Sequence, residues 1–113
     1  MSQGTTMTLP AALQAYFDAD TAGADTAPLG AFAPQAVVRD EGRTHVGHDA
    51  IAAWWRAAKA QYRHTAEPLE ATEDGGRTLV RARVTGDFPG SPADLTFAFR
   101  VEDGLITGLE IGA

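Results

Sequence analysis

One aspartate lies where a strand pattern turns it toward the protein interior. Ala36, Val38 and Asp40 occupy alternate positions of a predicted strand and therefore share one face. A carboxylate held against small apolar side chains is partly desolvated, which raises its pKa and makes it a better proton acceptor. We therefore expect Asp40 to act as a general base or to contact a ligand. A structural role also fits, in which Asp40 caps a turn or pairs with Arg43 or with a histidine.

A tyrosine and a histidine could complete such a site. Tyr16 shares the apolar face of a predicted helix with Leu13 and Phe17. A phenol that reaches the same cavity as a carboxylate can donate a hydrogen bond to a developing enolate. His64 opens a predicted strand, from which it could reach the cavity and exchange a proton with Asp40. Tyr16 could instead be an ordinary core aromatic residue, and His64 a surface histidine.

Two adjacent tryptophans, Trp54 and Trp55, lie within another predicted helix. Neighbouring side chains on a helix point about 100° apart, so the two are not expected to serve the same purpose. One should pack in the core, and the other should line a pocket or an interface.

Three further residues are close enough in sequence to suggest a metal site. However, His45, His48 and Asp49 straddle a predicted strand-to-helix turn and do not share one helical face. The chain has no cysteine. It also lacks a phosphate-binding loop, a dinucleotide fingerprint and an RNA-binding aromatic motif. We expect neither a metal nor another cofactor.

The spacing of apolar residues predicts the elements that hold these side chains. Helices are expected at about 9–23, 27–32 and 49–61, and strands at 36–41, 63–72, 78–86, 95–101 and 105–111, with a turn or short strand at 42–47. This order is typical of an α+β domain with one curved antiparallel sheet, which forms a cone, and three N-terminal helices on its concave face. The interior of such a cone suits a small molecule.

Length and composition fit one soluble globular domain. The chain has 113 residues, of which 44% are hydrophobic and 21% charged, close to the average for such proteins. We assign residues 9–113 to a single domain and residues 1–8, which are small and polar, to a flexible tail. That tail lacks the features of a signal peptide, which predicts a cytoplasmic protein. The net charge of −6 and the lack of a long apolar run argue against nucleic acid and membranes as partners.

Four stretches of the chain follow one another as they do in a known superfamily: 13–23, 29–40, 46–51 and 103–106. On these stretches the chain resembles the nuclear-transport-factor-2-like superfamily, also called cystatin-like. Within it, the chain looks most like the SnoaL-like branch, which is related to polyketide cyclases and ketosteroid isomerases. The resemblance implies that residues 9–113 form one SnoaL-like domain. It implies less about activity, because this fold hosts isomerases, cyclases, dehydratases and binding proteins.

The resemblance also gives roles to single positions. Asp40 falls where isomerase-like members carry the carboxylate general base, and Tyr16 where they carry an oxyanion-stabilising tyrosine. Two positions depart from those enzymes. Phe97 stands where they hold a second, protonated acid, and Trp55 where some relatives have a supporting tyrosine. The resemblance therefore favours Trp55 as the tryptophan that lines the pocket, and it argues against steroid isomerisation itself.

Two classes of function follow. The first is a cofactor-free isomerase, cyclase or dehydratase-like lyase that removes a proton next to a carbonyl, with Asp40 as base, Tyr16 as oxyanion donor and His64 as proton shuttle. The second is a non-catalytic ligand-binding or dimerisation module of the same fold. In either case the ligand would be a small apolar molecule, such as a carbonyl compound. The pocket wall is expected from Phe17, Phe32, Val38, Trp55, Phe97 and Phe99.

The resemblance further implies a homodimer. Relatives often pair through the outer face of the sheet, where Leu79, Arg81 and Arg83 fall by strand alternation. We expect these side chains to face solvent or a partner subunit.

Overall fold

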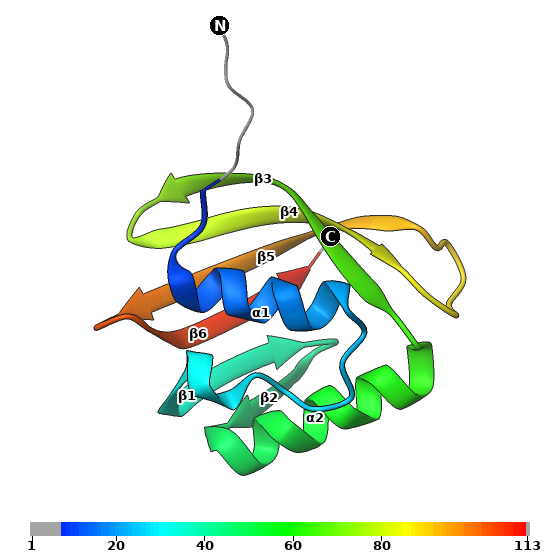
Figure 1. Cartoon of the computed structure of the whole chain (residues 1–113), viewed down its shortest axis with the longest axis horizontal. Coiled ribbons are helices and arrows are strands. Elements are labelled where there is room, and N and C mark those ends of the chain that lie inside the picture. Colours follow the sequence, from blue (N-terminus) through cyan, green and yellow to red (C-terminus); the bar gives the residue numbers. More distant parts are fainter. Residues whose placement is uncertain (1–7, 113) are drawn as a thin grey trace, which may run out of the picture.

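The computed structural model describes residues 8–112, which form an α+β domain of two α-helices, one short 3₁₀ turn and a six-stranded sheet (Figure 1). Residues 1–7 of the predicted tail lie outside the described residues. Neither described helix is both long and apolar enough to cross a bilayer. The helical elements are α1 (Ala11–Thr21), η1 (Leu29–Ala31) and α2 (Gly47–Tyr62), and the strands are β1 (Phe32–Asp40), β2 (Arg43–Val46), β3 (Thr65–Asp74), β4 (Arg77–Thr85), β5 (Ala93–Glu102) and β6 (Leu105–Gly112).

The prediction of a helix at 27–32 is wrong. Only the 3₁₀ turn Leu29–Ala31 forms there, and Phe32 already begins β1. Pro28 and Pro34 enclose the segment. Because proline has no backbone N–H and restricts the residue before it, too few residues remain between them for an α-helix. The described chain therefore has two helices where three were expected.

The sheet is mixed, in the order β2-β1-β6-β5-β4-β3. Neighbouring strands are antiparallel except β1 and β6, which run parallel with Val38 opposite Leu109. The prediction of a purely antiparallel sheet is therefore wrong at this one pair. The chain between β1 and β6 contains α2 and four other strands, so no hairpin fixes their relative direction. The alternation of apolar and polar residues within a strand does not indicate whether its neighbour runs parallel or antiparallel to it.

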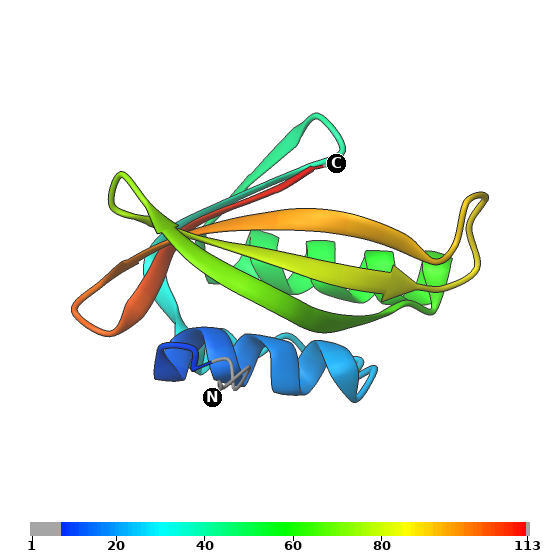
Figure 2. The same ribbon diagram turned by 90° about the horizontal axis from the view of Figure 1, so that it is seen from above.

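The core lies between the inner face of the sheet and the two helices. The predicted alternation is confirmed in β4, where Val80, Ala82 and Val84 are buried, and in β5, where Phe97 and Phe99 are buried. Helix α1 packs against β3, and α2 packs against β1 and β2. Figure 2 shows α1 running along one side of the curved sheet. Each large apolar side chain buried there stabilises the fold by about 1.5–3 kcal/mol.

The outer face of the sheet carries charged side chains that pair with one another. Arg81 contacts Glu70 and Asp94, and Arg83 contacts Asp94, at N–O distances of 2.8 to 3.1 Å. All four side chains are exposed, so these pairs contribute little to stability. Arg81 and Arg83 thus point away from the core, as alternation predicted.

Candidate functional site

A pocket of about 290 Å³ opens between the two helices and the inner face of the sheet. Its deep end is formed by buried aromatic side chains, among them Tyr16 of α1 and Phe97 of β5. Exposed residues line its other end, where Glu41 follows β1 and Pro89 belongs to the loop between β4 and β5. The pocket is therefore open to solvent at one end and largely apolar at the other.

Asp40 is the last residue of β1 and lines this pocket. The Trp54 indole Nε1 donates a hydrogen bond to Asp40 Oδ2 at 3.0 Å. Burial raises the pKa of Asp40, and this effect outweighs the Trp54 hydrogen bond and the charge of His45, both of which lower it. Within residues 8–112, no ion pair engages Asp40. Asp40 is thus a carboxylate of increased basicity whose one side-chain hydrogen-bond donor is neutral.

Tyr16 lies deep in the same pocket, 1% exposed. Five aromatic rings surround it at centroid distances of 5.1 to 6.1 Å, all edge-on, which fixes the direction of its hydroxyl. Burial raises the pKa of Tyr16 well above its usual value, and the negative charges of Asp20 and Asp40 raise it further. The phenol therefore stays protonated across the physiological range and can act as a hydrogen-bond donor.

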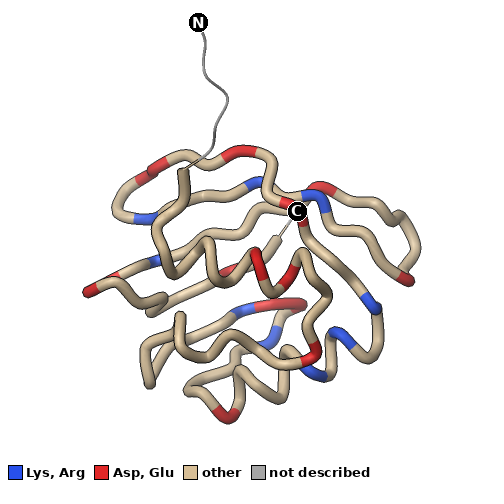
Figure 3. The backbone as a smooth tube through the Cα atoms, in the orientation of Figure 1, with Lys and Arg blue, Asp and Glu red and all other residues tan. Residues whose placement is uncertain are grey.

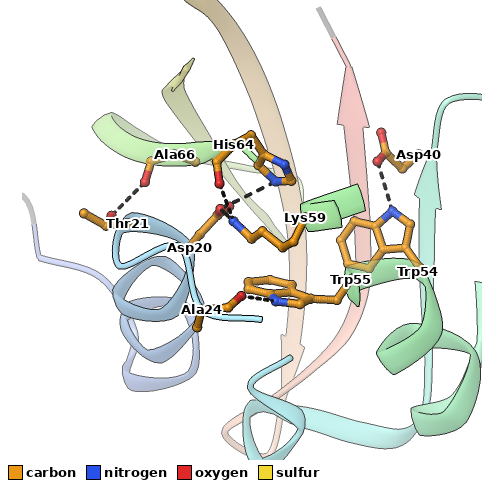
Figure 4. Close-up of polar contacts among 9 residues, drawn as sticks. All are labelled: Asp20, Thr21, Ala24, Asp40, Trp54, Trp55, Lys59, His64 and Ala66. Carbon is orange, nitrogen blue, oxygen red and sulfur yellow. Dashed lines mark hydrogen bonds and ion pairs between the residues drawn. The ribbon is translucent and has the colours of Figure 1, made fainter. Parts of the chain in front are cut away.

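Both tryptophans line the pocket, although the sequence predicted one. Their indole N–H groups have different acceptors, shown in Figure 4. The Trp55 Nε1 donates to the backbone oxygen of Ala24 at 2.8 Å, whereas the Trp54 Nε1 donates to Asp40. Trp55 thus offers a ligand only its ring, and Trp54 is the tryptophan that acts on a pocket carboxylate.

A second acid, Asp20 of α1, lines the pocket far from Asp40 in sequence and beside a lysine. The Lys59 ammonium contacts Asp20 Oδ1 at 2.5 Å and donates to the backbone oxygen of His64 at 2.8 Å (Figure 4). Both charged side chains are almost fully buried. Burial raises the pKa of Asp20, and the Lys59 charge opposes that shift. The pair links α1 to the end of α2 and to the residue before β3.

His64 belongs to this second cluster. Its Nε2 lies 3.7 Å from Asp20 Oδ1, and its buried Nδ1 has no partner within residues 8–112. Burial, together with the positive charge of Lys59, lowers the pKa of His64 to about 4. The imidazole is therefore neutral near pH 7. The exchange of a proton between His64 and Asp40 stays a prediction, and the carboxylate in contact with His64 is that of Asp20.

The chain matches a known family over most of its length. The model of the SnoaL-like domain family covers residues 13–109 of the chain. The chain belongs to the SnoaL-like family. No curated protein sequence matches it.

Solved structures agree with the assignment of a SnoaL-like domain. A candidate polyketide cyclase from Sinorhizobium meliloti is 52% identical, with a TM-score of 0.85 over 91% of this chain and 94% of that one. A ketosteroid isomerase-like fold from Catenulispora acidiphila, in complex with trimethylamine, is 21% identical, with a TM-score of 0.79 over 94% and 87%. A nuclear-transport-factor-2-like protein from Cytophaga hutchinsonii is 12% identical, with a TM-score of 0.73 over 96% and 92%. The last two likenesses support the fold alone.

The wall of the SnoaL-like pocket differs from the expected one. Trp55 and Phe97 line it, as expected. Four other predicted wall residues are fully buried in the core and absent from the lining, because their rings and methyl groups pack against one another: Phe17, Phe32, Val38 and Phe99. Strand and helix periodicity identifies inward-facing residues, but it does not separate those that border empty space from those that fill it.

Sequence reasoning missed Asp20 and Lys59 of this SnoaL-like domain, although a signal was present. Asp20 follows Tyr16 by four residues and Lys59 follows Trp55 by four, so each shares a helical face with a buried aromatic residue. Helix α1 carries two acidic residues and no basic one (Figure 3), which makes a partner from another element necessary for a buried aspartate. Within the described chain, no group of three residues is arranged as metal ligands.

Proposed function

We propose that this SnoaL-like protein is an isomerase- or cyclase-type enzyme that removes a proton from a carbon next to a carbonyl. The observation that carries the proposal is the presence of Asp40 and Tyr16 in one pocket. One supplies a carboxylate whose pKa is raised, and the other supplies a phenol that stays protonated. A base and an oxyanion donor are the two groups that this reaction class requires.

In the proposed step, an Asp40 carboxylate oxygen takes the proton from the carbon. The C–H electron pair forms the enolate double bond, and the negative charge moves to the carbonyl oxygen. The Tyr16 hydroxyl donates a hydrogen bond to that oxygen without giving up its own proton. The enolate can then take back the proton from Asp40 at another carbon. Alternatively, it can attack a second carbonyl to close a ring, where the C=O π bond breaks and the new alkoxide oxygen takes the proton from Asp40. No cofactor is needed for either outcome.

The test is proton exchange, because it needs no knowledge of the natural substrate. Small ketones and 1,3-dicarbonyl compounds are incubated with the protein in D₂O, and loss of the α-proton signal is followed by NMR. We expect Asp40→Asn to slow the exchange by about 10²–10⁴-fold and Tyr16→Phe by about 10²–10³-fold. Asp74→Asn removes the same charge from the exposed end of β3 and should leave the rate unchanged. An Asp40→Asn variant that exchanges as fast as the wild type removes the assigned base.

A second function, a non-catalytic ligand-binding module, is favoured by one observation. Phe97 lines the pocket where isomerase-like relatives hold a second acid, so this side contributes no hydrogen-bond donor. That function predicts ligand binding without proton exchange for every compound in the panel.

We also propose that the protein is a homodimer that pairs through the outer face of the sheet. Leu79 is half-buried there, beside charged side chains that already form ion pairs with each other. Burying this face in a dimer would therefore leave few charged side chains without a partner. Scattering at micromolar concentration should give the mass of two chains, and the mass of one chain would refute the dimer.

A further inference from the structure

Aromatic side chains dominate the wall of the pocket. They come from α1, α2, β5 and the loop between β4 and β5: Tyr16, Trp54, Trp55, Tyr62, Phe88 and Phe97. One of these rings already faces a cation, since the Lys59 Nζ lies 4.9 Å from the ring centroid of Trp55. The face of an aromatic ring is electron-rich and attracts cations.

The charged groups of the lining are acidic. Asp20, Asp40 and Glu41 line the pocket, and no lysine or arginine among residues 8–112 does so. Lys59, just behind the wall, balances the charge of Asp20. The other two acids receive only neutral donors, the Trp54 indole N–H and the Tyr62 hydroxyl, the latter 2.8 Å from Glu41 Oε2.

The remaining basic groups near these two acids are His64 and His45, and the charge of His45 acts on Asp40. His64 lines the pocket but is neutral near pH 7, because its pKa is lowered to about 4. His45 packs against the Trp54 ring at a centroid distance of 6.0 Å and is not part of the lining. The pocket therefore combines an acidic lining with aromatic faces, an environment that repels anionic ligands.

We infer that the ligand of this pocket carries a small organic cation, an alkyl-substituted ammonium group that lies among the aromatic rings beside Asp40 and Glu41. Such a group combines an apolar surface, which suits the rings, with a spread positive charge, which suits both the ring faces and the carboxylates. The inference rests on the pocket of the proposed function and names its ligand class. It does not depend on proton removal.

The experiment compares three probes of the same shape: choline as the cation, 3,3-dimethylbutan-1-ol as the neutral isostere and 3,3-dimethylbutanoate as the anion. Both tryptophans of the chain line the pocket, so their fluorescence reports binding, and calorimetry gives the affinity. We expect choline to bind about tenfold more tightly than the alcohol and the anion not to bind. A neutral isostere that binds as well as choline, or an anion that binds better, overturns the inference.

Variants locate the effect. Glu41→Gln and Asp40→Asn should each weaken choline binding several-fold and leave the alcohol unchanged. Glu110→Gln removes the same charge from the outer face of the sheet and should change neither. Choline binding that is insensitive to both pocket variants also refutes the proposal.

The outcomes separate this inference from the proposed function. Choline selectivity without exchange of any ketone would support the ligand class and reject the enzyme. Exchange of neutral ketones by a pocket that does not prefer choline would support the enzyme and reject the ligand class.

Discussion

Two aspartates line the pocket and differ in how each carboxylate is held. Asp20 and Asp40 line the same space, and burial raises the pKa of both. Asp20 is 1% exposed and is fixed by the Lys59 ammonium, whereas Asp40 is half-buried and receives its side-chain hydrogen bond from the neutral indole of Trp54.

This difference separates a structural acid from an available one. A carboxylate bound to a buried ammonium gives up part of its basicity to that pair, and removing either partner leaves an unpaired buried charge. A carboxylate that faces a neutral donor can accept a proton without breaking an ion pair. Asp40 is therefore suited to chemistry, and Asp20 to holding α1, α2 and the start of β3 together.

The largest effect should come from breaking the ion pair. We expect Lys59→Met to lower the free energy of unfolding by about 3–5 kcal/mol at neutral pH, because it leaves the Asp20 carboxylate buried without a cation. Urea unfolding measures this loss. Arg56→Met, an exposed change on the same helix, is the matched control and should have little effect.

The double variant Asp20→Asn/Lys59→Met should recover much of that stability, since it removes both charges. If Lys59→Met alone loses less than about 1 kcal/mol, the value typical of an exposed pair, the contrast between the two acids fails.

A smaller effect should appear in the pH dependence of the free energy of unfolding, through His64, which lies next to Asp20. In the unfolded chain His64 protonates near pH 6.5, and in the folded chain only near pH 4. Between these values the unfolded state binds more protons, so His64 lowers stability as the pH falls, by up to about 3 kcal/mol. Asp20 and Asp40 act in the opposite direction, because their folded-state pKa values are raised.

The His64 contribution is isolated by subtraction. As the pH falls from 6.5 to 4, the wild type should lose unfolding free energy relative to His64→Gln. A difference that stays constant over this range would show that His64 is free to protonate in the folded protein.

The smallest effect concerns the base itself. Trp54→Phe removes the hydrogen bond that lowers the pKa of Asp40, so that pKa should rise. The proposed exchange requires ionised Asp40, so the acid limb of its rate profile should move to higher pH. Trp55→Phe removes an indole whose N–H bonds to Ala24 instead, and it should leave the acid limb in place. Equal shifts in both variants would contradict the assigned base.

Much of the fold could be predicted because it depends on local spacing. Strand alternation places Ala36, Val38 and Asp40 on one face and thus predicted an inward-facing acid. In the structure, Asp40 lines the pocket. Pro68 has no backbone N–H to donate to a sheet, so a strand that contains it is expected at an edge or at a bulge. β3 is an edge strand, and its pairing shifts register between Pro68 and Glu70.

The sequence by itself determined which side chains face inward, since the periods of helix and strand assign each residue to one face. Tertiary structure alone decided what each of them meets there. Asp20 and Lys59 are 39 residues apart, and β1 pairs with β6 across most of the chain. No local period relates such residues. Which acid gains an ammonium and which an indole N–H was fixed only when the sheet curved and the helices packed onto it.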